Sequence, residues 1–153
     1  MKRSIFYIIT FLFIATSTLA QEIKEVDGKF YTSKGELYSG TYTEHYDNGQ
    51  IKIEASLKDG VYDGTIELYF RSGKLKEVRA YTKGKMDGEW ITFNPQGVKT
   101  AVAHYKAGKK HGEWKVWDDK GTLRYEMLYH EGQKTGTWKR YKEDGSLLAT
   151  KEF

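Results

Sequence analysis

The histidines are the side chains of this chain best suited to metal binding or proton transfer. The four of them, His45, His104, His111 and His130, occupy four different phases of the 24-residue repeat described below. A metal site needs ligands that converge, held by an ordered second shell of hydrogen bonds. The sequence therefore predicts surface histidines, with no metal ion and no other cofactor.

Acidic pairs are the next candidates for chemistry. Asp118-Asp119 and Glu143-Asp144 both fall in predicted turns, where Asp is favoured because it bonds to nearby backbone. The sequence has no cysteine, and no serine stands in a G-x-S-x-G motif. We therefore expect a protein without catalytic residues, not an enzyme.

Aromatic side chains recur at fixed spacing and are the candidate ligand-binding residues. Trp90, Trp114 and Trp138 each stand two residues after a glycine, and a second column five residues after it holds Tyr69, Phe93, Trp117 and Tyr141. Such rings suit anchoring of a ligand, because they are apolar with one polar handle. The alternative is that each ring packs against the next repeat. Both interpretations stay open at this stage.

Glycine gives the array its period. Of the 16 glycines, 14 belong to three series spaced by 24 residues: Gly40, Gly64, Gly88, Gly112 and Gly136; Gly49, Gly73, Gly97, Gly121 and Gly145; and Gly60, Gly84, Gly108 and Gly132. Glycine supplies the positive φ that closes tight hairpins. Between the turns, Leu123, Tyr125, Met127 and Tyr129 alternate with other residues as in a strand.

The period predicts an all-β fold, an elongated antiparallel meander of about five 24-residue β-hairpin repeats over residues 40–153. Residues 21–39 are expected to form a lead-in or degenerate repeat. One face of the sheet should carry the Trp and Tyr columns, and the other should carry Lys, Glu, Thr and Arg. A single sheet of this kind needs its own curl or a partner to cover the aromatic face.

Residues 1–20 have the features of a signal peptide. Lys2 and Arg3 precede an apolar run from Ile5 to Ile14, and Ala20-Gln21 suits cleavage. We expect an exported protein, periplasmic, secreted or on the cell surface; retention of the segment as an anchor is the alternative. Residues 21–153 keep 23 of the 25 basic residues and all 21 acidic ones, a net charge of about +2 of interspersed sign. This pattern predicts no nucleic-acid partner.

The unit G-x-W-x-x-(aromatic)-x-x-x-G-x-L, followed by Y-x-x-G, resembles a known repeat. With its start at Lys110-His111-Gly112-Glu113-Trp114, it is similar to the MORN-repeat variant of bacterial proteins, often labelled YwqK-type antitoxins. The resemblance covers about residues 36–153. It implies extended antiparallel hairpins and a role in contacting proteins or membranes. The predicted export differs from a cytoplasmic antitoxin.

The leading functional hypothesis is an exported, non-catalytic module that binds another protein, through the aromatic face or by strand addition at an open sheet edge. Two alternatives remain. One is an envelope module that binds glycan or lipid through the aromatic column, with recurring lysines such as Lys83, Lys85 and Lys109 along one rim. The other is an antitoxin-like or immunity-like protein.

Overall fold

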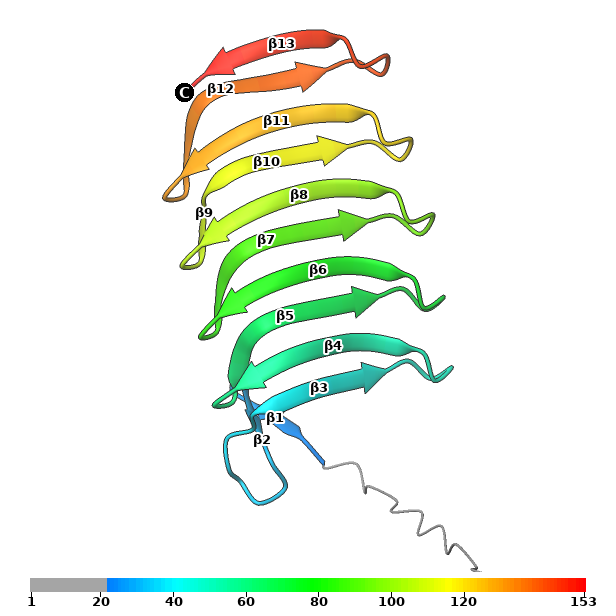
Figure 1. Cartoon of the computed structure of the whole chain (residues 1–153), viewed down its shortest axis with the longest axis vertical. Coiled ribbons are helices and arrows are strands. Elements are labelled where there is room, and N and C mark those ends of the chain that lie inside the picture. The colour runs from blue at the N-terminus through cyan, green and yellow to red at the C-terminus, as the bar shows by residue number, and fades with distance from the viewer. Residues whose placement is uncertain (1–21) are drawn as a thin grey trace, which may run out of the picture.

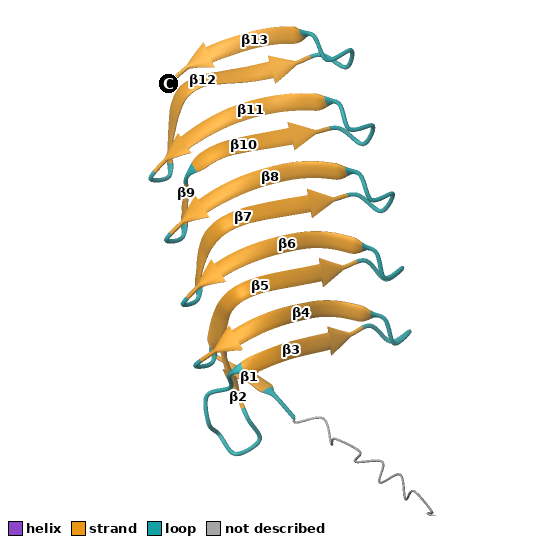
Figure 2. Ribbon diagram, viewed as in Figure 1, coloured by secondary structure: helices purple, strands orange, loops and turns teal. Residues whose placement is uncertain are grey.

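The computed structural model describes residues 22–153 and shows an open, curved antiparallel sheet in a single layer (Figures 1 and 2). Among these residues no helix is long and apolar enough to cross a membrane. The predicted signal peptide, residues 1–20, lies outside the described residues.

Five hairpins follow one another along the sheet in chain order. Ten of the 11 strands form the series, and β9 pairs with β8 beside β10. The strands are β3 (Gly40–His45), β4 (Ile51–Lys58), β5 (Val61–Tyr69), β6 (Leu75–Thr82), β7 (Lys85–Phe93), β8 (Lys99–Lys106), β9 (Lys109–Lys110), β10 (Gly112–Trp117), β11 (Leu123–His130), β12 (Gln133–Tyr141) and β13 (Leu147–Glu152). The prediction of an all-β meander of hairpin repeats is confirmed.

Two-residue turns join one hairpin to the next. In each turn a non-glycine residue with positive φ precedes a positive-φ glycine, as at Ala107-Gly108 and Glu131-Gly132. Two consecutive positive φ values define the tight turn that matches the twist of antiparallel strands. The glycines at positions 132 and 136 suggest from the sequence a turn over residues 131–136, but the turn is shorter, because residues 133–136 belong to β12.

Longer turns close each hairpin at the other end of the strands. In the fourth hairpin the Asp118 N–H donates to Thr122 O at 2.9 Å, and the Gly121 N–H donates back to Asp118 O at 2.9 Å. The strand register shifts beside every such turn, for example between Val116 and Trp117. The turn glycine and the neighbouring bulge therefore act together to reverse the chain.

A second glycine lies inside the first strand of several hairpins. Gly88 in β7 has a φ of 106°, and a Cβ placed there would lie 2.9 Å from the Cβ of Ala80. Only glycine allows the two strands to approach this closely with that backbone conformation.

The lead-in covers one end of the sheet. β1 (Lys24–Val26) and β2 (Lys29–Tyr31) form a separate two-stranded sheet. The Phe30 N–H donates to Gly60 O at 2.9 Å, and the Phe30 ring, 1% exposed, packs against Tyr42 and Tyr62. Phe30 therefore joins the lead-in to the first two hairpins.

The core is small because a single layer buries little. The buried apolar residues among 22–153 are Phe30, Ala55, Leu57, Ile66 and Tyr129. Trp90, Trp114 and Trp138 are half-buried. Within the part of the chain that the structure describes, neither face of the sheet is covered by a second layer, apart from the lead-in at one end (Figure 2).

Candidate functional site

A continuous series of stacked rings, here called the aromatic ladder, runs along one face of the sheet. Neighbouring ring centroids lie between 4.7 and 5.9 Å apart, in tilted or edge-on geometry. Its members are Tyr81, Trp90, Tyr105, Trp114, Tyr129, Trp138 and Phe153, continued at the lead-in end by Tyr62, Phe30 and Tyr42. Burial among these rings raises the pKa of the Tyr105 and Tyr129 phenols.

The three tryptophans of the ladder also use their polar atoms within the sheet. The indole N–H of Trp114 donates to His104 O at 3.0 Å, and that of Trp138 donates to Leu128 O at 3.0 Å. Trp90 makes the corresponding, longer bond to Ala80 O at 3.4 Å. Both the ring faces and the N–H groups are therefore engaged in packing one strand against another.

Cations lie against the ladder. Lys110 Nζ lies 4.5 Å from the ring centroid of Trp114 and 5.0 Å from that of Tyr129. Lys134 Nζ makes the same contact one repeat later, 4.6 Å from Trp138 and 4.9 Å from Phe153. These lysines share one repeat phase, so the ladder carries a row of positive charge at its C-terminal half.

The seven candidate rings do not form one surface. Met127 lies directly opposite Trp114, so Glu126, its neighbour in β11, faces the other side of the sheet. Tyr141 donates a hydrogen bond to Glu126. Tyr69 donates one to Glu67. Glu67 follows Ile66, which has the repeat phase of the ladder tryptophans, so Glu67 also faces away from the ladder. Tyr69 and Tyr141 therefore lie on the face opposite the ladder. The sequence had placed both ring columns on one face.

Phe93 and Trp117 follow the same column as Tyr69 and Tyr141. Each is the last residue of its strand, next to a register shift, with Phe93 opposite Lys99 and Trp117 opposite Leu123. Lys99 Nζ lies 5.1 Å from the Trp117 ring centroid. These rings cover the strand ends beside the longer turns.

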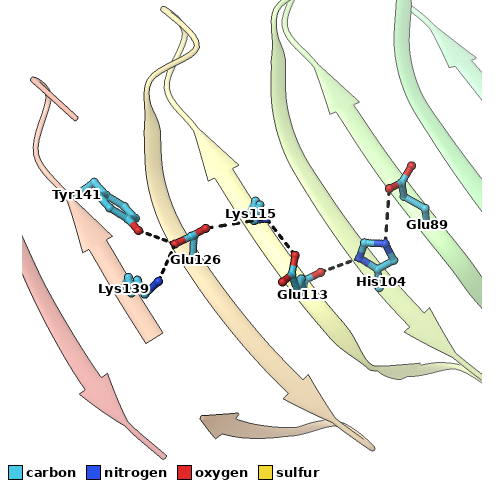
Figure 3. Close-up of polar contacts among 7 residues, drawn as sticks. All are labelled: Glu89, His104, Glu113, Lys115, Glu126, Lys139 and Tyr141. Atoms are coloured by element: carbon cyan, nitrogen blue, oxygen red, sulfur yellow. Dashed lines mark hydrogen bonds and ion pairs between the residues drawn. The ribbon is translucent and has the colours of Figure 1, made fainter. Parts of the chain in front are cut away.

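A row of polar side chains crosses β7 to β12 (Figure 3). Glu126 accepts from Tyr141 and lies 3.5 Å from Lys139 Nζ, while Lys115 Nζ lies 3.0 Å from Glu113. The hydrogen bond from Tyr141 and the charges of Lys139 and Lys115 lower the pKa of Glu126. The hydrogen bond to Glu67 raises the pKa of Tyr69 to about 12. Lysine and glutamate alternate from Lys139 through Glu126 and Lys115 to Glu113, so the charges of these four residues cancel.

Three histidines lie closer together than their sequence phases suggested. The rings of His111 and His130 are 5.1 Å apart, and His104 Nδ1 donates to Glu113 O at 2.7 Å. His104 and His111 line a cleft of about 490 Å³ with Asp87 and Glu113. Among residues 22–153, no group of three or more His, Cys, Asp or Glu side chains is arranged to hold a metal ion.

A groove of about 310 Å³ lies beside the last strand, β13. Its apolar lining comes from rings and short side chains of β11, β12 and β13, and its polar lining is basic: Tyr125, Met127, Trp138, Lys139, Arg140, Ala149, Thr150, Lys151 and Phe153. Of the candidate residues only Trp138 lines this groove, which we call the β13 groove.

The two edges of the sheet differ. Every residue of β13 is exposed, and large apolar side chains gather there: Leu147 is 53%, Leu148 43% and Phe153 43% exposed. In β3, at the other edge, no large apolar side chain is exposed. The hydroxyl of Tyr38 donates to Thr41 O in β3 at 2.9 Å and lies against Gly40. At the β3 edge, one backbone carbonyl is therefore already hydrogen-bonded by Tyr38. The β13 edge instead presents exposed apolar side chains.

A sequence signal for this edge exists in the repeat. Position 148 is phase-equivalent to Lys52, Lys76, Thr100 and Arg124, and Leu148 is the one apolar residue of that series. Sequence reasoning that looked for shared features of the repeats missed this departure.

Two segments match the family model of the MORN repeat variant, residues 38–59 and residues 110–131. The first spans β3 and β4, and the second spans β10 and β11. The chain therefore contains MORN-type repeats, which indicate a repeat-type interaction module. No curated protein matches the chain.

Proposed function

We propose that this chain is an exported, non-catalytic module that binds another protein by strand addition at β13. The apolar edge of β13 is the observation that carries the proposal. A sheet edge presents unpaired N–H and C=O groups, and natural proteins usually protect it with charges, short strands or covering segments. An extended segment of a partner could pair with this backbone and place alternate side chains into the β13 groove.

The contacts within the aromatic ladder favour the β13 edge, and not the ladder, as the binding site. The tryptophan N–H groups donate to backbone carbonyls, and each ring packs against its neighbours. A ligand held by the column would compete with these contacts. At β13 the apolar side chains of Leu147 and Leu148 have no such engagement, being about half exposed.

Export and a relationship to bacterial YwqK-type antitoxin proteins belong to the same proposal. Export is supported by the charged and apolar pattern of residues 1–20. The relationship is supported by the glycine and aromatic pattern from about residue 36 onward. Mass spectrometry of the protein recovered from the envelope should give Gln21 as the first residue; recovery of the full-length chain from the cytoplasm would contradict export.

Site-specific photo-crosslinking tests the edge. A photoreactive residue is introduced in the full chain at Thr150 in β13 or, as the matched control, at Thr43 in β3; both positions are exposed threonines of an edge strand. We expect a discrete protein adduct from position 150 and none from position 43. Equal adducts from both positions, or none from position 150, would refute binding at β13.

A second variant checks that the apolar edge matters. Leu148→Lys restores the residue type found at Lys52 and Lys76, and it leaves the buried core residues untouched. We expect a native circular dichroism spectrum and a weaker adduct at position 150. An unchanged adduct would mean that Leu148 takes no part in binding.

A further inference from the structure

We infer that the segment which adds to β13 is acidic, with a carboxylate side chain opposite Lys151. This inference rests on the proposed function and specifies the chemistry of the partner. It is argued from the charges around the β13 groove.

The β13 groove is lined by three cations and no carboxylate. Its charged residues are Lys139, Arg140 and Lys151. Lys139 is already paired with Glu126, at 3.5 Å between Nζ and Oε2. Among residues 22–153, no carboxylate lies within ion-pair distance of Arg140 or Lys151. The groove therefore presents uncompensated positive charge in a chain whose charges are otherwise interspersed.

An earlier repeat shows what Lys151 lacks. Arg79 in β6 has the same repeat phase as Lys151, and Ala149 has the phase of Glu77. Arg79 pairs with Glu77 at 2.6 Å and lies 5.0 Å from the ring centroid of Trp90. Lys151 lies 4.8 Å from the centroid of a different ring, Phe153, which has the repeat phase of Tyr81, and alanine replaces the acid. A carboxylate from a partner would give Lys151 the acidic neighbour that Glu77 provides for Arg79.

The register of the sheet supports the same conclusion. Within the chain, Glu126 of β11 and Lys139 of β12 lie directly opposite each other and form a cross-strand ion pair. Opposite charges at directly opposed positions stabilise strand pairs, and like charges destabilise them. A strand added to β13 would therefore favour Asp or Glu opposite Lys151, with Arg140 and Lys134 adding to the positive field.

Two synthetic peptides of equal length test the inference, one alternating Glu with Val and the other alternating Lys with Val. Binding to the full chain is followed through the amide resonances of β13 and through Kd. We expect the acidic peptide to shift the β13 resonances and to bind on the order of tenfold more tightly than the basic one. The difference should shrink as ionic strength rises.

Three variants sharpen the test. Lys151→Glu should reverse the preference, while Lys85→Glu, an exposed cation in β7 outside the groove, should leave it unchanged. Ala149→Glu should abolish the preference with Lys151 intact, because it recreates the internal pair of Glu77 and Arg79. A preference that survives both Lys151→Glu and Ala149→Glu would overturn the inference.

The remaining outcomes separate this inference from the proposed function. Equal binding of both peptides at β13 would overturn the acidic partner and leave strand addition standing. Absence of shifts in β13 with either peptide would contradict strand addition itself. Phosphatidylcholine vesicles containing phosphatidylserine serve as the third probe. Lys151-dependent binding to them as tight as to the acidic peptide would assign the groove to an anionic membrane surface and overturn the peptide.

Discussion

At the scale of single residues, Trp114 shows how one side chain joins three strands. Its ring packs between Tyr105 of β8 and Tyr129 of β11, and its N–H bonds to the backbone of β8. Trp117, three residues on, is the last residue of β10 and contacts Lys99. We therefore expect the two tryptophans to contribute differently to the stability of the fold, although they stand only three residues apart after the same glycine.

We expect Trp114→Ala to lower the free energy of unfolding by about 2–3 kcal/mol, because it removes a half-buried ring and two ring contacts. Trp114→Phe should cost about 1 kcal/mol, mainly the lost N–H bond. Urea unfolding followed by circular dichroism measures both, with Trp117→Ala as the control. A Trp114→Ala cost no larger than that of Trp117→Ala would contradict a structural role for the ladder.

Acid stability should depend on Glu126. The pKa of Glu126 is lowered in the folded chain, so its carboxylate stabilises the fold above its unfolded pKa, and this contribution is lost as pH falls through the folded pKa. Between about pH 5 and pH 3, Glu126→Gln should lose less stability than the natural chain, by on the order of 1 kcal/mol. Thermal unfolding across this range measures the loss. Glu113→Gln, which changes a more exposed carboxylate, is the control, and parallel curves for Glu126→Gln and the natural chain would refute the prediction.

The sequence predicted which ring positions recur, but not how the two columns divide between the faces. Counting residues from the glycine makes positions such as Trp114 and Trp117 look alike. Tyr69 and Tyr141, which share the repeat phase of Trp117, bond to Glu67 and Glu126 on the face opposite the ladder, as an odd spacing of three from the ladder phase implies. That odd spacing is visible in the sequence once residues are counted by strand alternation and not from the glycine. The register shifts beside the turns are not visible, because a bulge depends on the paired strand.

At the scale of the elements, the two-residue turns carry a conformational cost. The non-glycine place is held by Asp27, Asp59, Lys83, Ala107 and Glu131, all with φ between 48° and 51°. Asp tolerates this left-handed conformation better than Ala, because its side chain can bond to nearby backbone. The turn at Ala107 is therefore less suited to its own geometry than the turns at Asp27 and Asp59.

Ala107→Asp should raise the free energy of unfolding by roughly 0.5–1 kcal/mol, because Asp59 already holds the equivalent place. Equilibrium unfolding measures the gain. Lys106→Asp, at the end of β8 and outside the positive-φ pair, is the matched control and should give none. A loss of stability in Ala107→Asp would show that the turn conformation differs from that described.

The boundaries of the strands were only partly predictable from the positions of glycine. The two glycines of residues 131–136 suggested a single turn over all six residues, whereas the structure turns at Glu131-Gly132 alone and includes Gly136 in β12. Gly88 shows why: the glycine permits the close approach of Ala80 across the strand pair and does not mark a turn. A contact between strands cannot be distinguished from a turn by residue type.

At the scale of the whole molecule, each hairpin contacts only its neighbours, so a local change should have local effects. Phe30→Ala should cost about 3–4 kcal/mol in the region it covers, because the ring is buried against Tyr42 and Tyr62. Hydrogen exchange should show lost protection in β3, β4 and β5 and little change in β11 to β13. Uniform loss along the sheet would indicate a single cooperative unit instead.

The meander itself was predictable because glycine, aromatic and turn positions share one register. The difference between the β3 and β13 edges was not predicted. It depends on the hydrogen bond from Tyr38 to Thr41 and on Leu148, which departs from the repeat. Repetition predicts what the units have in common, and the candidate site lies where they differ. That is why only Trp138 of the seven predicted residues lines the β13 groove.

The hairpin-by-hairpin pairing of the sheet has a mechanical consequence. A force applied at one end of an edge strand peels that strand from its neighbour one hydrogen bond at a time, while each inner pair shares the load among all its hydrogen bonds. The hairpins would then open one after another, starting from the edge that is pulled. Each opened repeat converts roughly 10 Å of folded length into roughly 80 Å of extended chain. The molecule would respond to tension by lengthening in steps, as an extensible tether does, while the hairpins not yet opened stay folded.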